Sequence, residues 1–579
     1  MGENEITPKK RKKLFKSLNK KQKIGLGATS IIAVTAIFSG IYFFGKLQEE
    51  PEPIFICGLD SFPDSIDPLI NPGPRYVNLM LLDQITEGLY RYNQNKTNTP
   101  IEPNLALNGT WSPDHLNFTC ILRQDVTFHD GTPFNAAAVK WNFDRLYRFS
   151  KIMPYNQIWA WNYSYYNEEG KPRIDKTVII DDYTIRFVVN RPYVPIKDLL
   201  ALWQSYILSP TSTPENEPIN KRTEKLVGTG PFIFDSCQVD IDGEIIQTDM
   251  HANPDYWGGK PSIKKLRFLG LINPTERMER MLSGELSYAM GVRNDYILDI
   301  YRNTSGITVI PKTSSGFNHL SMNNLKINAT MRRAISYAFN YSRYIEEIWG
   351  GHAERARSPL PKKMPYSNWD DFDVPYYNIS RARQILKDAK WPGTKNLTAN
   401  ENMTTGNEWE SIANSPTPLS TYNFSSFNWW MDFVANFTVE HLKQIGIKIN
   451  LIRLEQLDFW DKMYKGELEL FTGIWGAAML DPVEVINPCY SYKLDGAEGN
   501  HINFNDIEVQ QWMEDALEEF NETAREQLYF NIQKKLIEQL NPVLWLVFPI
   551  SYDIWDSNVR GISIEGQQLK FMLKNVYLI

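Results

Sequence analysis

An uncharged apolar run near the N-terminus constrains this chain more than any other feature. Residues 24–45, IGLGATSIIAVTAIFSGIYFFG, contain no Asp, Glu, Lys or Arg. About 20 consecutive apolar residues cross a bilayer, whereas the apolar part of a cleaved signal peptide is about 7–15 residues long. The run therefore predicts an uncleaved transmembrane anchor, with a cleaved signal sequence as the alternative.

The charges on either side of this run predict its orientation. Residues 1–23 carry nine Lys or Arg and two Glu, a net charge of +7, and the acidic sequence EEPEP follows the run. Basic residues flank the cytoplasmic end of a membrane helix. We therefore expect a cytoplasmic tail at 1–23, a linker at 46–53 and all later residues outside the cell. About a dozen Asn-X-Ser/Thr sequences, including those at Asn328 and Asn521, agree with a glycoprotein on that side.

The remainder of the chain has the composition of a large acidic globular protein. Of 579 residues, 61 are Lys or Arg and 68 are Asp or Glu; without the tail these become 52 and 66, a net charge of −14. This acidity excludes an extended nucleic-acid-binding face. Aromatic residues make up 13% and include 17 Trp, which favours ring surfaces in a ligand cleft as well as in the core.

Strand-like and helical patterns alternate along the acidic part. Residues 54–59 (IFICGL) are typical of a buried strand, and a helix is expected at 78–89. Further on, one helical face carries four apolar residues, Val434, Phe437, Leu442 and Ile445. This helix is expected to end at Gly446, before the apolar strand IKINLI. Such alternation predicts α/β lobes with open sheets.

No catalytic or metal-binding motif is present. The sequence lacks G-x-S-x-G, H-E-x-x-H, a Walker loop and a G-x-G-x-x-G after a strand, and its seven His are isolated from one another. We therefore expect a protein that is not an enzyme. The cysteines leave two alternatives open, up to two disulfides outside the cell or isolated buried thiols, for Cys57, Cys120, Cys237 and Cys489.

The sequence TFHDGTPFNAAAVKWNFDRL, residues 127–146, places His129 next to Asp130, as acid–base catalysis would require. The Gly-Thr-Pro that follows is typical of a tight turn. We therefore expect this segment to turn the chain before a helix at 135–146, and not to catalyse a reaction. The helix should bury three apolar residues, Val139, Phe143 and Leu146.

An ordered series of sequence blocks makes the chain resemble a known family. The longest is PNLALNGTWSPDHLNFTCILRQDVTFHDGTPFNAAAVKWNFDRL at 103–146. It is followed by VIIDDYTIRFVVNRPYVPIKDLLA, GTGPFIF, NPDYWGGKPSIKKLRF, MRRAISYAFNYSRYIEEIWGGHAERARSPLP, YYNISRARQILKDAKWP, HLKQIGIKINLI and DKMYKGELELFTGIWGAAMLDPVEV. From residue 54 onward the chain thus resembles the family 5 extracellular solute-binding proteins, the oligopeptide-, dipeptide- and nickel-binding components of ABC importers.

The resemblance implies an α/β, two-lobed periplasmic-binding-protein-like (type II) fold with an extra domain inserted in lobe I, preceded here by one N-terminal transmembrane helix. Mapped onto this chain, lobe I comprises 54–92, 206–311 and 542–579, the inserted domain 93–205 and lobe II 312–541. Strands near 310–317 and 542–547 are expected to join the lobes. A cleft between two lobes is a usual place for a ligand.

In the family, the loop after the first strand, here 60–67, and the tract GIWGAAMLDP border the ligand cleft. The implied ligand-binding residues are Ser61, Phe62, Ile66, Asp67, Phe317, Tyr422, Trp429, Trp475, Gly476, Ala478 and Asp481. In the peptide-binding members, an Asp at the position of Ala478 pairs with the ammonium group of the peptide. A buried ammonium without a countercharge costs several kcal/mol, so a free peptide N-terminus is disfavoured in that pose. Asp481 is a substitute partner, although an Asp before a Pro is also typical of a turn.

The expected function is that of a membrane-tethered receptor outside the cell. It would capture a peptide or an oligosaccharide-like solute by domain closure, as a monomer, and pass it to ABC permease subunits. We expect no catalytic residue, no metal, no cofactor and no nucleic-acid partner, because the isolated His disfavour nickel and haem. The alternatives are an oligosaccharide-binding importer component, and a surface receptor or structural envelope glycoprotein that transports nothing.

Overall fold

The computed structural model describes most of the chain that follows the predicted linker. The chain forms two units, Met1–Pro53 and Ile54–Ile579. The described residues are 52–63, 65–70, 76–93, 101–153, 165–166, 171–222, 224–399, 406–477, 479–494, 499–562 and 573–579. The predicted anchor at 24–45 lies outside them. No helix within these ranges is long and apolar enough to span a membrane.

A mixed sheet of twelve strands runs through the described part of the unit Ile54–Ile579. Its first half is built around β1 (Ile54–Leu59), the predicted apolar strand, which pairs in parallel with β10 (Lys265–Gly270) and β11 (Tyr288–Val292). A strand with neighbours on both sides is expected to be buried, and Cys57 and Leu59 have no exposed surface. The other elements here are α3 (Tyr76–Ile85), β8 (Phe232–Val239), β9 (Ile245–Ala252), α7 (Pro274–Leu282), α8 (Asp295–Arg302) and β12 (Ile307–Thr313).

The second half of the sheet continues through β13 (Gly316–Met322) and the antiparallel β17 (Leu470–Gly476) to β15 (Ser420–Ser426) and β16 (Ile447–Arg453). The helix α13 (Trp429–Leu442) connects β15 to β16. Its predicted apolar face is confirmed, because Val434, Phe437, Leu442 and Ile445 are all buried. Gly446 ends the 3₁₀ turn Lys443–Ile445 that follows α13, and its φ of 76° is a left-handed conformation that favours glycine. β16 begins at the next residue, as predicted.

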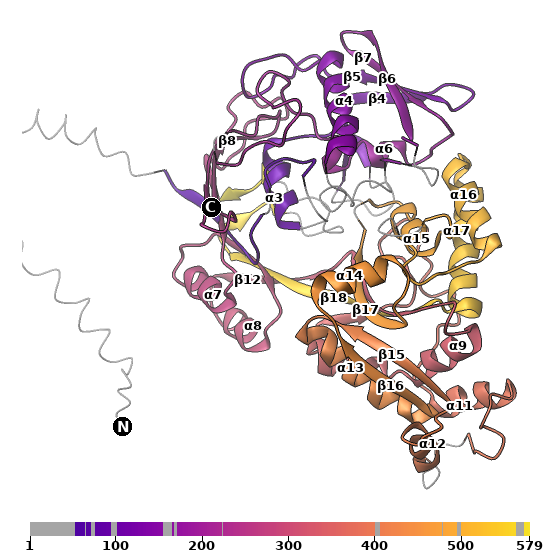
Figure 1. Cartoon of the computed structure of the whole chain (residues 1–579). Coiled ribbons are helices and arrows are strands. Elements are labelled where there is room, and N and C mark those ends of the chain that lie inside the picture. The colour runs from indigo at the N-terminus through magenta and orange to yellow at the C-terminus, as the bar shows by residue number, and fades with distance from the viewer. Residues whose placement is uncertain are drawn as a thin grey trace, which may run out of the picture. The chain divides into compact units, whose positions relative to one another are not determined.

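Helices cover this second half. They are α9 (Ala329–Ala338), α10 (Tyr341–Trp349), α11 (Ile379–Asp388), α12 (Gly406–Ala413), α14 (Gln456–Tyr464), α15 (Val483–Tyr490), α16 (Ile507–Glu518) and α17 (Glu522–Lys535). A π-helical turn at Leu536–Leu540 follows α17. Figure 1 shows α16 and α17 side by side, in agreement with their close mutual packing.

One long strand joins the two halves of the sheet. The first part of β18 (Val543–Asp556) pairs with β13 and with β14 (Ala353–Arg355), and its later part pairs with β12 and β11. In Figure 1 this yellow strand passes from the strands beside α7 and α8 toward those beside α13. The strands expected to connect the lobes are therefore β12, β13 and β18. We call the half built on β1 lobe I and the half built on β13, β15, β16 and β17 lobe II.

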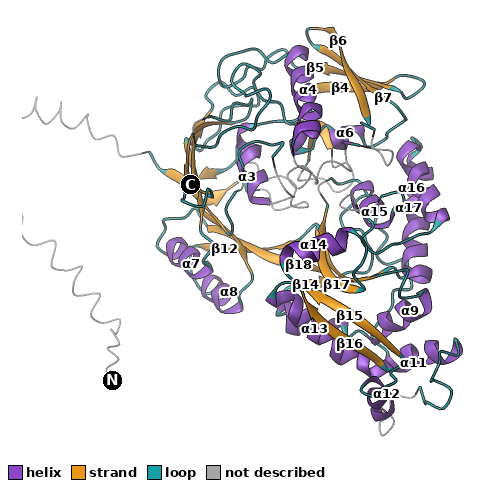
Figure 2. Cartoon of the chain, in the orientation of Figure 1, coloured by secondary structure: helices purple, strands orange, loops and turns teal. Residues whose placement is uncertain are grey.

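A separate four-stranded antiparallel sheet belongs to the segment predicted as the inserted domain. Its order is β4 (Ala106–Trp111), β5 (Asn117–Leu122), β7 (Thr184–Val189) and β6 (Ile174–Asp181), and α4 (Ala136–Ile152) packs against β6 and β7. Figure 2 shows this sheet and helix together. Val139, Phe143 and Leu146 of α4 are buried, as predicted. Short elements complete the fold: β2 (Tyr90–Tyr92), β3 (Ile101–Pro103), α6 (Ile196–Leu199), a 3₁₀ turn at Trp203–Ser205, β19 (Val559–Arg560) and β20 (Tyr577–Leu578).

The His-Asp-Gly sequence before α4 is a turn. Gly131 has a φ of 82°, and its N–H donates to the carbonyl oxygen of Phe128 at 2.9 Å. The carboxylate of Asp130 accepts from the N–H of Thr132 at 3.0 Å. Nε2 of His129 bonds the carbonyl oxygen of Gly230, and burial lowers the pKa of this His to about 4. The predicted turn is therefore confirmed, and its side chains are engaged in local structure.

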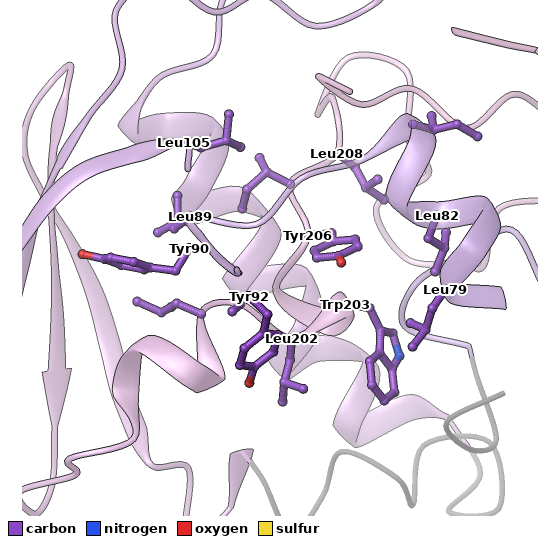
Figure 3. Packing of buried hydrophobic residues seen from close by; sticks show 14 of the residues in the cluster. Leu79, Leu82, Leu89, Tyr90, Tyr92, Leu105, Leu202, Trp203, Tyr206 and Leu208 are labelled. Carbon is purple, nitrogen blue, oxygen red and sulfur yellow. The ribbon is translucent and has the colours of Figure 1, made fainter. Parts of the chain in front are cut away.

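Lobe I and the inserted sheet share one core. A single buried cluster contains Phe55 of β1, Met80 of α3, Phe118 of β5 and Val139 of α4. Figure 3 shows the part of it where α3 and β2 meet the segment 202–208. The cysteines add no covalent link, because Cys57, Cys120, Cys237 and Cys489 are all free thiols. Of the two alternatives drawn from the sequence, the structure has isolated thiols.

Asparagine starts many of the helices. The helices α4, α7, α8, α9, α10, α11, α13 and α17 each have an Asn N-cap whose side chain accepts a hydrogen bond from a main-chain N–H of the first turn. Asn, Asp and Ser are the favoured N-cap residues, because the first N–H groups of a helix lack partners within it. Asn328, Asn378 and Asn521 are both N-caps and part of Asn-X-Ser/Thr sequences. Helix capping therefore accounts for part of the abundance of such sequences.

Candidate functional site

The tract that follows β17 packs against lobe I. Leu480 and Val483 belong to the buried cluster of lobe I, although β17 itself lies in lobe II. The N–H of Leu480 donates to the hydroxyl of Tyr92, 3.4 Å away. Nearby, the N–H of Val194 donates to the carbonyl oxygen of Leu517 at 2.9 Å. The two lobes therefore meet at these five residues, which we call the lobe contact.

A buried ion pair lies on the lobe II side of the lobe contact. Nη2 of Arg525 in α17 is 2.8 Å from Oδ2 of Asp481, and the two side chains are 5% and 6% exposed. Asp481 also accepts from the N–H of Val483 at 3.0 Å and from the hydroxyl of Tyr529 at 3.4 Å. Burial opposes the charge of Arg525, but Asp481 raises the net pKa of the guanidinium above its usual value. Asp481 thus forms the turn before α15 and also holds an arginine.

Asp198 of α6, in the segment predicted as the inserted domain, faces this ion pair. Its Oδ1 accepts a hydrogen bond from the hydroxyl of Tyr92 at 3.3 Å, and it forms no ion pair with the residues that the structure describes. Burial, and next the negative charge of Asp481, raise the pKa of Asp198 to about 8, while Arg525 acts in the opposite direction. The hydroxyl of Tyr193 is buried here without a hydrogen-bond partner among the described residues. The guanidinium of Arg173 lies over the ring of Tyr193, 4.8 Å from its centroid, so a second arginine also stands near Asp198.

Trp475 and Gly476 are the last residues of β17, just before the tract that leads to Asp481. In the pairing of β13 with β17, Phe317 stands opposite Trp475 and Gly316 opposite Gly476. Phe317 is 1% exposed in the core of lobe II, whereas Trp475 and Gly476 are half-buried. Nε1 of Trp475 donates to the carbonyl oxygen of Glu484 at 3.3 Å. This bond fixes the indole beside the start of α15, and part of its surface remains exposed.

The loop after β1 contributes two half-buried and two buried residues. Ser61 and Phe62 are half-buried, and the ring of Phe62 lies against Gly270 so closely that a Cβ there would be 2.1 Å from Cδ1. Ile66 and Asp67 are buried. Nη2 of Arg145 lies 2.5 Å from Oδ2 of Asp67, with both side chains almost fully buried. Asp67 therefore fastens this loop to α4.

The remaining expected site residues lie apart from the lobe contact. Tyr422 of β15 is 8% exposed and belongs to the core of lobe II. Trp429, the first residue of α13, is 70% exposed and packs edge-on against Phe433, with 5.9 Å between the ring centroids. Ala478 lies outside the described residues. The structure thus brings Asp481 to the lobe contact beside Trp475 and Gly476, and leaves Trp429 on the surface.

Sequence reasoning missed Tyr92 of the lobe contact and three residues beside it, Tyr193, Asp198 and Arg525. The short helix α6 begins directly after Pro195, and its Asp198 stands in the first turn. An acidic residue is common at the start of a helix, so the sequence did not mark Asp198 as a site residue. The charged residues Lys197 and Asp198 in an otherwise apolar sequence, PIKDLLA, were the available signal for Asp198. The sequence gave no signal for Arg525, because this buried residue stands in a helix rich in charged and exposed residues. No group of three or more potential metal ligands occurs within the described ranges.

Comparison with known sequences gives a family match over most of the chain. Residues 100–496 match the model of the bacterial extracellular solute-binding proteins, family 5 Middle. The probable D,D-dipeptide-binding periplasmic protein DdpA of Escherichia coli K12 is 24% identical over 545 residues, which cover 91% of this chain and 94% of that protein. The heme-binding protein A of Haemophilus influenzae is 26% identical over 509 residues, 82% of this chain and 86% of that protein.

Solved structures share the fold. The ABC transporter-associated periplasmic binding protein DppA of Helicobacter pylori, in complex with the peptide STSA, aligns with a TM-score of 0.70 and 22% identity over 92% of this chain and 99% of that chain. HbpA2 of Haemophilus parasuis aligns with a TM-score of 0.74 and 21% identity over 91% and 100%. The mixed α/β, two-lobed periplasmic-binding-protein fold is thereby confirmed.

Proposed function

This chain belongs to the bacterial extracellular solute-binding proteins of family 5, and on that premise we propose that it captures a peptide between its lobes and delivers it to the permease of an ABC importer. The observation that carries the proposal is the family match over residues 100–496. It is supported by curated relatives named for binding dipeptides and tripeptides and by a similar structure solved with a peptide. The proposal includes no catalytic step.

Capture proceeds by closure of the lobes. The hydrogen bonds from Leu480 to Tyr92 and from Val194 to Leu517 join the lobes directly, so they must break when the lobes separate. A ligand favours the closed state only by the free energy that it gains from touching both lobes at once. β18 belongs to both halves of the sheet and is the continuous element about which they move.

The ligand lies against the ends of β1 and β17. Ser61 and Phe62 supply the lobe I side, and Trp475 and Gly476 supply the lobe II side, because all four keep exposed surface. Phe317, buried in the core of lobe II and paired with Trp475 across β13 and β17, supports this wall. Ile66, Asp67 and Asp481 shape the walls through packing and ion pairs.

The charges near the lobe contact do not by themselves separate a peptide from a neutral sugar. Asp481 and Glu484 stand near two arginines, Arg525 and Arg173, and Asp198, whose pKa is about 8, is uncharged at neutral pH. The relatives named for binding dipeptides and tripeptides are what favours a peptide. An oligosaccharide is the second candidate, and the half-buried indole of Trp475 is the observation that favours it.

The position of the receptor follows from the N-terminal sequence. Residues 24–45 anchor the monomeric protein in the cell membrane, with the unit Ile54–Ile579 outside, and Asn-X-Ser/Thr sequences there carry glycans. The proposal thus describes a receptor tethered beside its permease. Tethering keeps the receptor at a high local concentration near the permease.

A thermal-shift screen of the full-length protein in mild detergent tests this function. A ligand at 100 times its Kd adds about 2.7 kcal/mol to the free energy of unfolding, which is a readily measured increase in Tm. Di- to pentapeptides should stabilise the protein. Stabilisation by oligosaccharides alone would replace the peptide by the second candidate. If peptides, oligosaccharides and nickel chelates all left the Tm unchanged, this result would contradict solute binding.

Two matched tryptophan variants locate the ligand. Trp475→Leu should abolish the peptide-induced increase in Tm, because the indole is part of the proposed wall. Trp391→Leu is the control, since Trp391 is also half-buried and its Nε1 also donates to a main-chain carbonyl oxygen, that of Leu419 at 3.2 Å. Equal loss of the peptide response in both variants would contradict the proposed place of the ligand.

A further inference from the structure

The segment predicted as the inserted domain also meets lobe II at the turn between α16 and α17. The ring of Phe520 in this turn stacks on the imidazole of His115, with 3.8 Å between the ring centroids and 19° between the ring planes. Phe520 also packs edge to face with Trp111, at 5.4 Å between centroids and 88° between planes. Trp111 and His115 belong to the hairpin of β4 and β5. One ring of lobe II is therefore held by two rings of the inserted sheet.

The hairpin fixes the position of both of its rings. Trp111 packs on Phe118 of β5, which has no exposed surface, with 5.1 Å between the centroids. His115 has a φ of 55°, a left-handed conformation that is uncommon for residues other than glycine. Its N–H donates to the carbonyl oxygen of Ser112 at 2.9 Å, and the N–H of Asn117 donates to Oγ of Ser112 at 3.0 Å. The imidazole is therefore carried by a turn that is closed by its own hydrogen bonds.

An ion pair and a hydrogen bond join the same two segments beside these rings. Nε of Arg191, which follows β7, lies 3.7 Å from Oε1 of Glu518 at the end of α16. The N–H of Val194 donates to the carbonyl oxygen of Leu517 at 2.9 Å. Leu517 is 8% exposed and belongs to the buried cluster that lobe I shares with the inserted sheet, although α16 lies in lobe II. Three neighbouring residues of lobe II, Leu517, Glu518 and Phe520, thus each contact the inserted segment.

We call the five residues whose side chains make this contact, Trp111, His115, Arg191, Glu518 and Phe520, the clasp. They lie outside β12, β13 and β18, the strands that join the lobes, so the two sides of the clasp separate when the lobes move apart about those strands. They also lie outside the wall proposed for the solute. The clasp therefore favours the closed state to the same extent whichever solute is bound.

We propose that the clasp holds the lobes closed, and that the inserted domain thereby takes part in retaining the solute without touching it. A contact that exists only in the closed state adds its free energy to that state and raises its population. Packed aromatic pairs contribute more than the area that they bury, so the ring of Phe520 supplies most of this effect. The proposal rests on the lobe closure of the proposed function, but not on the chemical nature of the solute.

Hydrogen exchange of the Val194 amide reports on the clasp, because this N–H donates to lobe II beside it. The exchange is measured by mass spectrometry on the full-length protein in mild detergent, with no solute added. Phe520→Ala should speed the exchange of this amide by a factor of about 5 or more, because both ring contacts are lost. Phe433→Ala is the control and should leave the exchange unchanged. Phe433 is also a phenylalanine of lobe II that packs edge-on against a tryptophan, at 5.9 Å, but it lies outside the clasp.

Amides inside α16, such as that of Met513, are the internal reference and should exchange in Phe520→Ala as they do in the natural chain. Exchange of Val194 that Phe520→Ala leaves unchanged would overturn the proposal, and so would an equal increase at Met513, because the substitution would then act on the fold. The measurement needs no solute, so its failure is distinct from that of the thermal-shift screen. A protein that no solute stabilises, but whose Val194 amide responds to Phe520→Ala, would contradict solute binding and support the clasp.

A charge exchange tests the ion pair of the clasp at side chains that are 59% and 43% exposed, so that the fold is not at risk. Arg191→Glu and Glu518→Arg should each speed the exchange of the Val194 amide about two- to fivefold, because each places like charges opposite one another. The double variant Arg191→Glu/Glu518→Arg restores opposite charges and should exchange as the natural chain does. A double variant in which the two effects add would overturn the place of this ion pair in the clasp.

Discussion

Replacing Asp198 by Asn should make the protein more stable at alkaline pH and leave it unchanged near pH 4. The side chain stands at the lobe contact, where burial and the charge of Asp481 raise its pKa from 3.8 to about 8. Asn has the same shape and still accepts the hydrogen bond from Tyr92. The substitution therefore removes only the charge that forms as the pH rises.

The sign of the effect follows from the two pKa values. Between pH 4 and 8 the unfolded chain ionises Asp198 while the folded chain keeps it protonated, so the unfolded state is favoured progressively as the pH rises. Each pKa unit corresponds to about 1.4 kcal/mol, and the full shift gives an upper limit of about 6 kcal/mol. Because Asp198 is half-buried and shares its field with Asp481 and Arg525, we expect about 2–3 kcal/mol.

The measurement is the difference in Tm between Asp198→Asn and the natural chain at half-unit steps from pH 4.5 to 9. The difference should be near zero at the acid end, grow with pH and level off above pH 8. Titrating groups that do not interact with Asp198 affect both proteins alike and cancel. Asp242→Asn, at an exposed position between β8 and β9, serves as the control and should show no such trend. A difference for Asp198→Asn that stays constant over this range would refute the reasoning.

Three further substitutions test single features of the fold by urea unfolding. Arg145→Met leaves the buried carboxylate of Asp67 without its cation and should cost about 3–5 kcal/mol of stability. The control Arg148→Met removes a more exposed ion pair of the same helix and should cost less than about 1 kcal/mol. Equal losses of stability would contradict a special role of the buried pair. Asn521→Ala removes the N-cap of α17 and should cost about 1 kcal/mol, while Asn521→Gly should cost only a few tenths. Gly446→Val places a branched side chain at a φ of 76° and against Leu419, and should lower the stability by about 1–3 kcal/mol, so a neutral result would contradict the backbone argument.

The sequence by itself predicted the elements whose signals are local. The apolar strand at 54–59, the helix with Val434 on its buried face and the turn at Gly131 were all predicted correctly, because periodicity and turn residues report which side of a segment is apolar and where the chain must bend. The family resemblance, carried by blocks in order along the chain, gave the two-lobed fold. The predicted helix at 78–89 ends earlier, at Ile85, because Glu87 leaves it to bridge Ile207.

The pairing of the functional residues was decided only by the tertiary structure. Asp481 pairs with Arg525, 44 positions later in the sequence, and Asp67 pairs with Arg145, 78 positions later. Neither local sequence indicates which residue the aspartate will pair with. A local pattern determines which face of an element is buried, but the path of the whole chain determines what that face is buried against. For this reason the sequence predicts the helices and strands of this protein, whereas the tertiary structure determines which charged residues become neighbours.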